Sequence, residues 1–255
     1  MKVFPGLFFL MLSLPVFSQE DTTHISTDRP DQSDGAYIVR PAVLQLETGT
    51  YVNTLDQYNQ ALVQSTMLRY GLVNRVELRV LFDAGIFNNQ YAHTSSNGIF
   101  PLTFCSKINL VKGKSIVPDI TLSGYLRLPF TASENLRTPH YAQTGILVLQ
   151  KTIGKMFTVA LNAGISRSGF DKSLSYPVTA VFILAPQAHF SFFGEYYASY
   201  QTQCLPLNNI DFGFLYCTHH HIQLDVAFGT TLLPNVKSNF VTAGFSYRFS
   251  SLKNK

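Results

Sequence analysis

The chain has 255 residues, with 19 Lys and Arg against 15 Asp and Glu, which gives a formal net charge of +4 at pH 7. So small an excess of positive charge does not predict a nucleic-acid-binding surface. Charged residues make up only 13% of the chain, about half of the globular average, while 46% are hydrophobic. Few charges together with 21 Phe and 13 Tyr indicate a surface that meets lipid rather than water.

Residues 1–18 have the features of a secretory signal peptide. Lys2 is the only charge before Glu20, an apolar stretch runs from Leu7 to Leu14, and the small residue Ser18 precedes the expected cleavage site. The apolar stretch is too short to cross a bilayer as a helix. We therefore expect the mature chain to be exported, and a buried N-terminal strand or anchor is the alternative.

Residues 19–41 form a polar, Asp-rich stretch that shows no periodicity and no apolar face. It contains Asp28, Arg29, Pro30 and Asp31 in succession. We expect an extended periplasmic lead-in that tucks under or into the domain that follows. That domain is expected to cover residues 42–250, and residues 251–255 form a short polar tail.

Twelve stretches of the main domain alternate between apolar and polar residues, which is the period of a β-strand with one face in lipid. In the clearest, residues 76–83, Glu77, Arg79 and Asp83 fall on one face, whereas a helix would scatter them around its circumference. The sixth and eighth stretches are apolar on both faces, so their direction is ambiguous. The twelve predicted strands cover residues 43–52, 62–70, 76–83, 100–110, 119–128, 141–150, 157–164, 178–185, 189–199, 209–217, 222–229 and 240–249.

The predicted connections alternate between short and long. The short ones are residues 71–75, 111–117, 151–155, 186–188 and 218–221, and the long ones are 53–61, 84–99, 129–140, 165–177, 200–208 and 230–239. This rhythm is typical of a closed, antiparallel, up-and-down transmembrane β-barrel with both termini in the periplasm. A soluble sandwich is the alternative, but strands of about 9–11 residues match a tilted membrane span better than its usual 5–6. The final strand also ends in an aromatic residue, Phe249, as outer-membrane barrels do for recognition by their assembly machinery.

If the apolar faces meet lipid, the polar faces line the lumen. The predicted lumen residues are Glu47, Arg69, Glu77, Arg79, Lys107, Tyr125, Arg127, Glu195, Asp211, Asp225 and Arg248. Five are basic and five acidic, which argues against strong selectivity for anions or cations. Because unpaired charges in a narrow barrel are costly, we expect pairing. These residues either brace a closed lumen or line a path for small solutes.

Twelve strands enclose a lumen between that of a packed eight-stranded barrel and that of an open porin, so we expect a narrow or gated path. The lead-in residues Asp28, Arg29 and Asp31 could plug the lumen by pairing with its charges.

The sequence predicts neither a metal site nor a cofactor. His219, His220 and His221 lack acidic partners at ligand spacing, with only Cys217 nearby, and are expected in a solvated turn. The three cysteines, an odd number, are not expected to form a disulfide. His140 and His189 have no evident Ser and acid partners, and G-x-S-x-G, H-E-x-x-H and P-loop motifs are absent. We expect no enzyme; a lipid-modifying barrel and a structural barrel for envelope integrity remain alternatives to a channel.

Four stretches resemble one family of outer-membrane proteins. They are residues 27–32 (TDRPDQ), 68–80 (LRYGLVNRVELRV), 101–129, which begin with Pro-Leu-Thr and end with Leu-Arg-Leu-Pro, and the closing residues 243–249 (AGFSYRF). They are similar to the family described as the putative MetA-pathway of phenol degradation, especially to its Bacteroidetes transporter-like members. The resemblance implies a passive channel for small solutes, aromatic or apolar compounds among them. It names no cargo.

Overall fold

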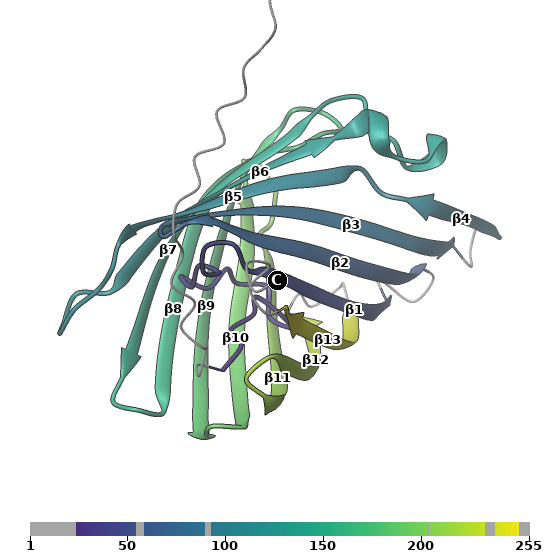
Figure 1. Cartoon of the computed structure of the whole chain (residues 1–255). Coiled ribbons are helices and arrows are strands. Elements are labelled where there is room, and N and C mark those ends of the chain that lie inside the picture. The colour runs from purple at the N-terminus through teal and green to yellow at the C-terminus, as the bar shows by residue number, and fades with distance from the viewer. Residues whose placement is uncertain (1–23, 55–58, 90–92, 203, 233–237, 250–255) are drawn as a thin grey trace, which may run out of the picture.

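The computed structural model describes residues 24–54, 59–89, 93–202, 204–232 and 238–249. The predicted signal peptide and the tail after residue 250 lie outside these residues. The described chain is almost entirely β-structure (Figure 1). Its strands are β1 (Leu44–Thr54), β2 (Asn59–Val73), β3 (Val76–Asn89), β4 (Thr94–Ile99), β5 (Leu102–Val111), β6 (Asp119–Leu128), β7 (Ala142–Ile153), β8 (Phe157–Arg167), β9 (Leu174–Gln187), β10 (Phe190–Gln201), β11 (Leu207–His219), β12 (Ile222–Thr231) and β13 (Asn239–Arg248). Two short 3-10 helices, η1 (Pro129–Thr131) and η2 (Glu134–Leu136), connect β6 to β7.

The strands form one closed antiparallel barrel of twelve positions. Apart from β4 and β5, each strand pairs with its neighbours in sequence, and β1 pairs with β13 from Gln45 opposite Arg248 to Thr54 opposite Asn239. The thirteen segments fill twelve positions because β4 and β5 both pair with β3, one along its second half and the other along its first. The predicted closed barrel of twelve strands is confirmed.

One predicted connection is wrong. Residues 84–99 were expected to form a long loop, but β3 continues to Asn89 and β4 begins at Thr94. The β3–β4 pair runs from Ala84 opposite Ile99 to Asn89 opposite Thr94, so it extends the wall as a hairpin. Polar residues such as Asn88, Ser95 and Asn97 dominate this hairpin, and the alternation that marks a lipid-facing strand is therefore absent from its sequence.

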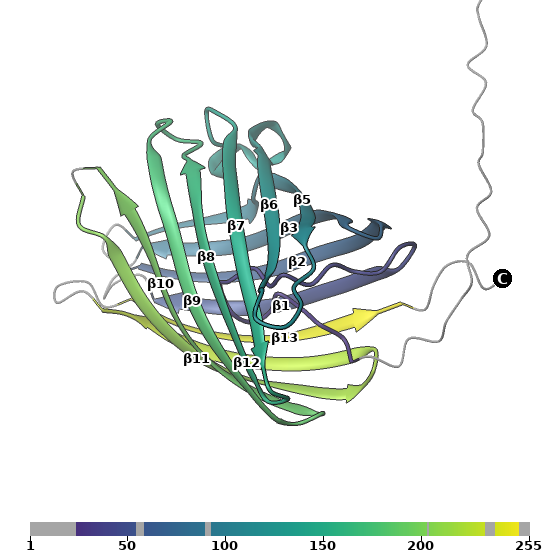
Figure 2. The same ribbon diagram turned by 90° about the vertical axis from the view of Figure 1, so that its left-hand side faces the viewer.

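The two ends of the barrel differ. At one end, which we call the turn end, β1 begins next to the end of β13, with the Phe249 amide donating to the Leu44 carbonyl at 2.9 Å. Tight turns at residues 74–75, 188–189 and 220–221 lie at the same end, because each follows a strand that runs back from the other end of the barrel. The other end, the loop end, carries the longer connections, including η1 and η2 (Figures 1 and 2).

The barrel is polar inside and apolar outside. The largest fully buried side chains include Arg69, Arg79, Lys107 and Arg248. Phe, Leu and Val side chains instead cover the outer wall, and Phe228 is 59% exposed. Phe190, Phe192, Phe214 and Tyr216 form part of this apolar surface on β10 and β11, with ring centroids 4.9–5.7 Å apart. This arrangement suits a wall bathed in lipid, with its backbone hydrogen bonds satisfied from strand to strand.

No helix in the described part of the chain has the length and apolar character needed to cross a membrane.

Replacing Val226 with Arg tests the orientation of the wall. Val226 lies in the middle of β12, is 44% exposed and points outward. A charge on the lipid face near the bilayer midplane is expected to destabilise the barrel by about 2–4 kcal/mol, whereas Val226→Leu should have little effect. Urea unfolding from lipid vesicles, monitored by circular dichroism, measures the free energy of unfolding of the two variants. Equal stability of the two variants would contradict a lipid-facing Val226.

Candidate functional site in the barrel lumen

The lumen is occupied by the chain's own residues 24–41, which we call the N-terminal segment. The segment enters at the turn end, where the His24 ring lies 4.8 Å from that of His220. It then crosses the lumen and returns to the turn end, where Pro41 forms an isolated bridge with Gly71. Figures 1 and 2 both place the segment within the ring of strands. The lead-in therefore lies inside the barrel over the residues that the structure describes.

The segment has no regular secondary structure, so its backbone groups need partners other than themselves. Inward-facing side chains of the wall supply them. The Asp28 amide donates to Glu47 and the Gln32 amide to Glu195. The Ala36 amide donates to Gln150 and the Val39 amide to Glu77, and the four distances are 2.6–3.1 Å. Four strands on different sides of the barrel therefore hold the segment by hydrogen bonds to its backbone.

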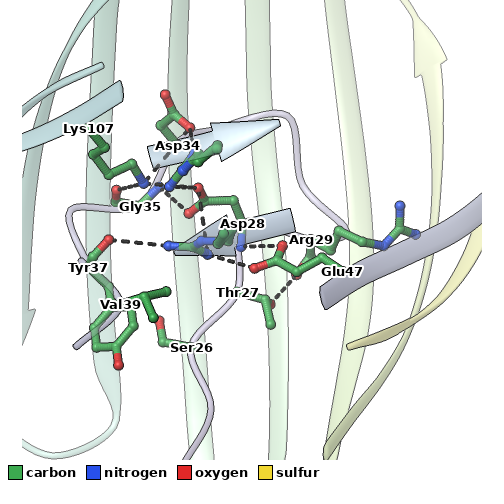
Figure 3. A network of polar contacts seen from close by, with 12 residues as sticks. Ser26, Thr27, Asp28, Arg29, Asp34, Gly35, Tyr37, Val39, Glu47 and Lys107 are labelled. Carbon is green, nitrogen blue, oxygen red and sulfur yellow. Dashed lines mark hydrogen bonds and ion pairs between the residues drawn. The ribbon is translucent and has the colours of Figure 1, made fainter. Parts of the chain in front are cut away.

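Asp28 is the centre of the charged contacts (Figure 3). Its Oδ2 lies 2.5 Å from Arg79 Nη2, 2.9 Å from Lys107 Nζ and 3.9 Å from Arg69 Nη1. Burial opposes ionisation of Asp28, but the cations of Arg79, Lys107 and Arg69 hold its pKa well below the usual range. Asp28 is thus an ionised carboxylate that three wall cations bind at once.

The wall residues around Asp28 also pair with one another. Arg69 donates through Nε to Glu77 at 2.7 Å and through Nη1 to Glu47 at 2.6 Å. Arg79 Nε lies 2.5 Å from the same Glu77 oxygen. These side chains are fully buried, so each charge depends on the others for the solvation that water would otherwise provide.

Asp34 binds the same wall from further along the segment. Its Oδ1 lies 3.1 Å from Arg79 Nη1, and the Tyr125 hydroxyl donates to it at 2.6 Å. Cys105 lies between Arg79 and Tyr125 in the strand register and is only 5% exposed. Asp34, absent from the predicted plug residues, is therefore a second acidic anchor of the segment.

Arg29 holds the segment to β12 and β13. Its Nη2 lies 3.1 Å from Asp225 Oδ1 and donates to the Thr242 hydroxyl at 3.0 Å. The guanidinium lies flat against Gly49 and Gly244, which face each other across β1 and β13. A Cβ atom at either glycine would overlap the Arg29 side chain. The paired glycines therefore provide the room that Arg29 needs to reach Asp225.

Replacing Gly244 with Ala should loosen the segment. The added methyl group displaces the Arg29 guanidinium and leaves the buried Asp225 without its cation, a loss of about 1–3 kcal/mol in docking free energy. We expect a higher ion conductance in planar bilayers than for the unmodified chain. Gly145→Ala is the matched control, because nothing lies within 4 Å of the atom it adds. Equal conductance of both variants would argue that Arg29 does not hold the segment.

Asp31 does not find the predicted cationic partner. It lies near Glu195 and Asp211, whose charges act on it, and no ion pair to any of these three carboxyl groups is present among the described residues. Ser33 donates its hydroxyl to Glu195 and lies 2.5 Å from the Thr179 hydroxyl. On this side of the lumen the described contacts of the segment with the wall are made by carboxyl and hydroxyl groups and by the Gln32 amide, without an ion pair.

Two cavities lie on either side of the segment. The larger, of about 430 Å³, is lined by Tyr51, Tyr125, Tyr197 and Phe240 from the wall and by residues 28–34 of the segment. The smaller, of about 190 Å³, is lined by His24, Cys217 and Gln223 near the turn end. Arg29, Pro30 and Asp31 line both cavities. These three residues therefore form the partition between them.

At the turn end, three imidazole rings meet where the segment enters. The His24 ring lies 5.4 Å from His189 and 4.8 Å from His220. Burial, together with the nearby His220, His189 and Arg248, lowers the pKa of His24. The tight turn is formed by His220 and His221, since β11 extends to His219, whose side chain lies outside the described residues. Within the described chain, no group of three or more His, Cys, Asp or Glu side chains is arranged to hold a metal ion.

The structure places the predicted lumen residues on the inner face of the wall. All are buried except Tyr125, which is half-buried, and Arg127, which is exposed inside the loop end with its Nε 3.4 Å from the Thr103 hydroxyl. Arg248 donates to the His220 carbonyl at 2.8 Å. The sixth and eighth predicted strands, whose direction was ambiguous, turn Val148 and Val181 inward and Leu147 and Phe182 outward.

Sequence reasoning missed several lumen residues. The omitted members are Gln45, Gln150, Thr179 and Gln223 of the wall, together with Ser33, Asp34 and Gly35 of the segment. Gln45 and Gln223 could have been found, since each occupies an inward position of an alternating strand, whereas Gln150 and Thr179 lie on the two strands whose direction was ambiguous. The segment members carried no periodic signal.

The two histidines that were considered for catalysis lie at different ends of the barrel. His140 lies in the connection between β7 and the 3-10 helices, where its backbone amide donates to the Gly169 carbonyl at 2.9 Å. His189 Nδ1 lies 2.8 Å from the Cys217 carbonyl at the other end of the barrel. All three cysteines are free.

The barrel is similar to solved outer-membrane structures. An outer membrane channel from Pseudomonas putida F1 matches with a TM-score of 0.72 at 14% identity, over 86% of this chain and 100% of that chain. The NanC porin matches with a TM-score of 0.59 at 8% identity, over 79% and 98% of the two chains. The KdgM porin, in complex with disordered oligogalacturonate, matches with a TM-score of 0.58 at 11% identity, over 80% and 99%. At these identities the likeness shows the fold, which is that of bacterial outer-membrane barrels.

No curated protein is a detectable relative of this chain. The model of the family described as "Putative MetA-pathway of phenol degradation" matches residues 27–249, from the N-terminal segment to the last strand. This match covers most of the chain, and the chain therefore belongs to that family.

Proposed function

We propose that the chain is a passive outer-membrane channel for small solutes, closed by its N-terminal segment in the conformation described here. The observation that carries this proposal is the pair of cavities on either side of Arg29, Pro30 and Asp31, which line both of them. A barrel evolved only to brace the membrane has no need of open space on both sides of a thin partition. Movement of the segment would join the two cavities into a path along the barrel.

The topology supports an orientation in the membrane. In outer-membrane barrels the chain ends and the short turns face the periplasm. The turn end would therefore be periplasmic, and the larger cavity would open to the outside. Residues 1–18 would direct export and be cleaved, and β13, with Phe249 directly after it, would be recognised by the barrel-assembly machinery.

The larger cavity favours small aromatic or apolar solutes. Rings of Tyr51, Tyr197 and Phe240 line it together with Met67 and Leu81. Aromatic side chains supply broad apolar contact, and the tyrosine hydroxyl groups add polar contacts that suit a phenol-like compound. The description of the family points to the same class of solute.

Liposome swelling tests the proposal. Vesicles containing the purified chain should admit phenol-sized solutes faster than vesicles containing a heat-denatured sample, whose lipid sets the background rate, and the gain for sugars of similar charge should be smaller. A structural barrel is the second candidate, favoured by the buried ion pairs of Arg69 and Arg79. It predicts no uptake, even after removal of the segment. Turnover of labelled phospholipid would instead support a lipid-modifying enzyme.

A further inference from the structure

Three carboxyl groups meet where the N-terminal segment touches β10 and β11. Glu195 and Asp211 are directly opposite each other on the two strands, and both face the lumen. Because the two residues are opposite in the strand register and both are buried, a proton on one carboxyl group would relieve the repulsion between them. Asp31 of the segment lies near both.

The hydrogen bonds around the cluster assign different states to its members. Glu195 accepts from the Gln32 amide at 2.7 Å and from the Ser33 hydroxyl, as an ionised carboxylate does. Asp211 is fully buried, and no donor among the described residues outside the cluster reaches either of its oxygens. A buried carboxylate with no donor and no cation is expensive, so Asp211 is better placed to carry a proton.

Among the described residues, no cation forms an ion pair with the cluster. Arg29, the closest basic residue of the segment in sequence, is bound to Asp225 on β12. Lys107 and Arg79 are bound to Asp28 on the far side of the segment. The other groups that face the cluster are neutral or acidic: Thr179 of β9, Tyr197 of β10, and Asp28 itself.

We propose that Asp31, Glu195 and Asp211 form a proton-binding site that keeps the N-terminal segment docked, and that losing its protons in alkaline solution releases the segment. Three negative charges would then repel one another. Asp31 is the only member outside a strand, so the segment rather than the wall moves. This inference rests on the proposed role of the segment as the closure of the lumen.

The direction of the pH effect follows from the docked state. Burial, together with the charges of Glu195, Asp28 and Asp211, raises the pKa of Asp31 well above its usual range. The docked segment thus binds a proton that the free segment releases. Docking is therefore strongest at low pH and weakens as pH rises through the raised pKa. The pKa of His24 is lowered, so its imidazole does not change charge in the alkaline range and does not contribute there.

Cys105 provides a reporter of the segment that needs no transport. It is buried in the lumen wall next to Tyr125, which binds Asp34 of the docked segment. With Cys204 and Cys217 replaced by Ser, the rate at which a charged methanethiosulfonate reagent labels Cys105 measures release of the segment. The comparison is made between the parent chain and Asp211→Asn at the same pH, so that ionisation of the thiol itself cancels.

Near pH 7 we expect Cys105 to be labelled at the same rate in the parent chain and in Asp211→Asn. Near pH 9.5 we expect the labelling rate of the parent chain to be roughly fivefold higher than that of Asp211→Asn. Asp31→Asn, which leaves the wall unchanged, should behave like Asp211→Asn. Asp83→Asn is the control, because it removes an inward carboxyl group of β3 outside the cluster, and it should follow the parent chain.

Identical pH profiles for the parent chain and both cluster variants would overturn the proton site. Parallel current recordings separate this result from failure of the channel proposal. Labelling that depends on pH without any current would support the site and refute the channel.

Discussion

Deleting residues 24–40 is expected to raise ion conductance in planar bilayers roughly tenfold, because a twelve-stranded barrel without its N-terminal segment leaves a lumen wide enough for water and small solutes. The segment contributes the partition of Arg29, Pro30 and Asp31 and contacts at least four strands. The barrel itself should persist, since its strands close through β1 and β13 without the segment.

A double substitution of Asp28 and Asp34 with Asn serves as the companion variant. It retains the segment but removes its charged contacts with Arg79 and Lys107. We expect a conductance between those of the intact and the deleted chains. If the deletion leaves conductance unchanged, the segment does not close the lumen and the ion pairs serve only to brace the wall.

Replacing Arg69 with Met is expected to destabilise the barrel by about 3–5 kcal/mol, the range found when one partner of a buried ion pair is removed. Arg69 binds both Glu47 and Glu77, and all three side chains are inaccessible to solvent. Without it, Glu47 loses the ion pair that it makes with Arg69, and Glu77 shares the guanidinium of Arg79 with Asp28 and Asp34.

Urea unfolding from vesicles measures this loss, with Lys112→Met as the matched control. Lys112 lies 3.8 Å from Asp119 in a pair whose lysine side chain is 75% exposed, and such pairs contribute little. Adding Glu47→Gln and Glu77→Gln to Arg69→Met should recover part of the stability, because no unpaired charge then remains. A stability loss no larger than that of Lys112→Met would contradict the assigned network.

The strand alternation was sufficient to predict the barrel and the inward direction of its charges. Every second residue of a lipid-exposed strand must be apolar, so Glu77 and Arg79 could point only inward. The β3–β4 hairpin escaped prediction because it shares no such constraint and is rich in Ser and Asn.

The course of the N-terminal segment could not be read in the same way. Charge complementarity was enough to suggest that Asp28 and Arg29 pair with the wall, but not which partners they choose. Asp31 is the same type of residue as Asp28, yet it lies among carboxyl groups on the other side of the lumen. That difference depends on the path of the segment across the lumen, which no periodic pattern records.

The most direct test of the central claim is a reversible lock on the segment. The hydroxyl oxygens of Ser33 and Thr179 lie 2.5 Å apart, so Ser33→Cys with Thr179→Cys, in a chain whose native cysteines are replaced by Ser, should tie the segment to β9. Current is recorded through the same bilayer before and after adding a reductant. We predict a low current while the disulfide is intact and a severalfold rise after reduction. A current that is the same in both states would contradict closure of the lumen by the N-terminal segment.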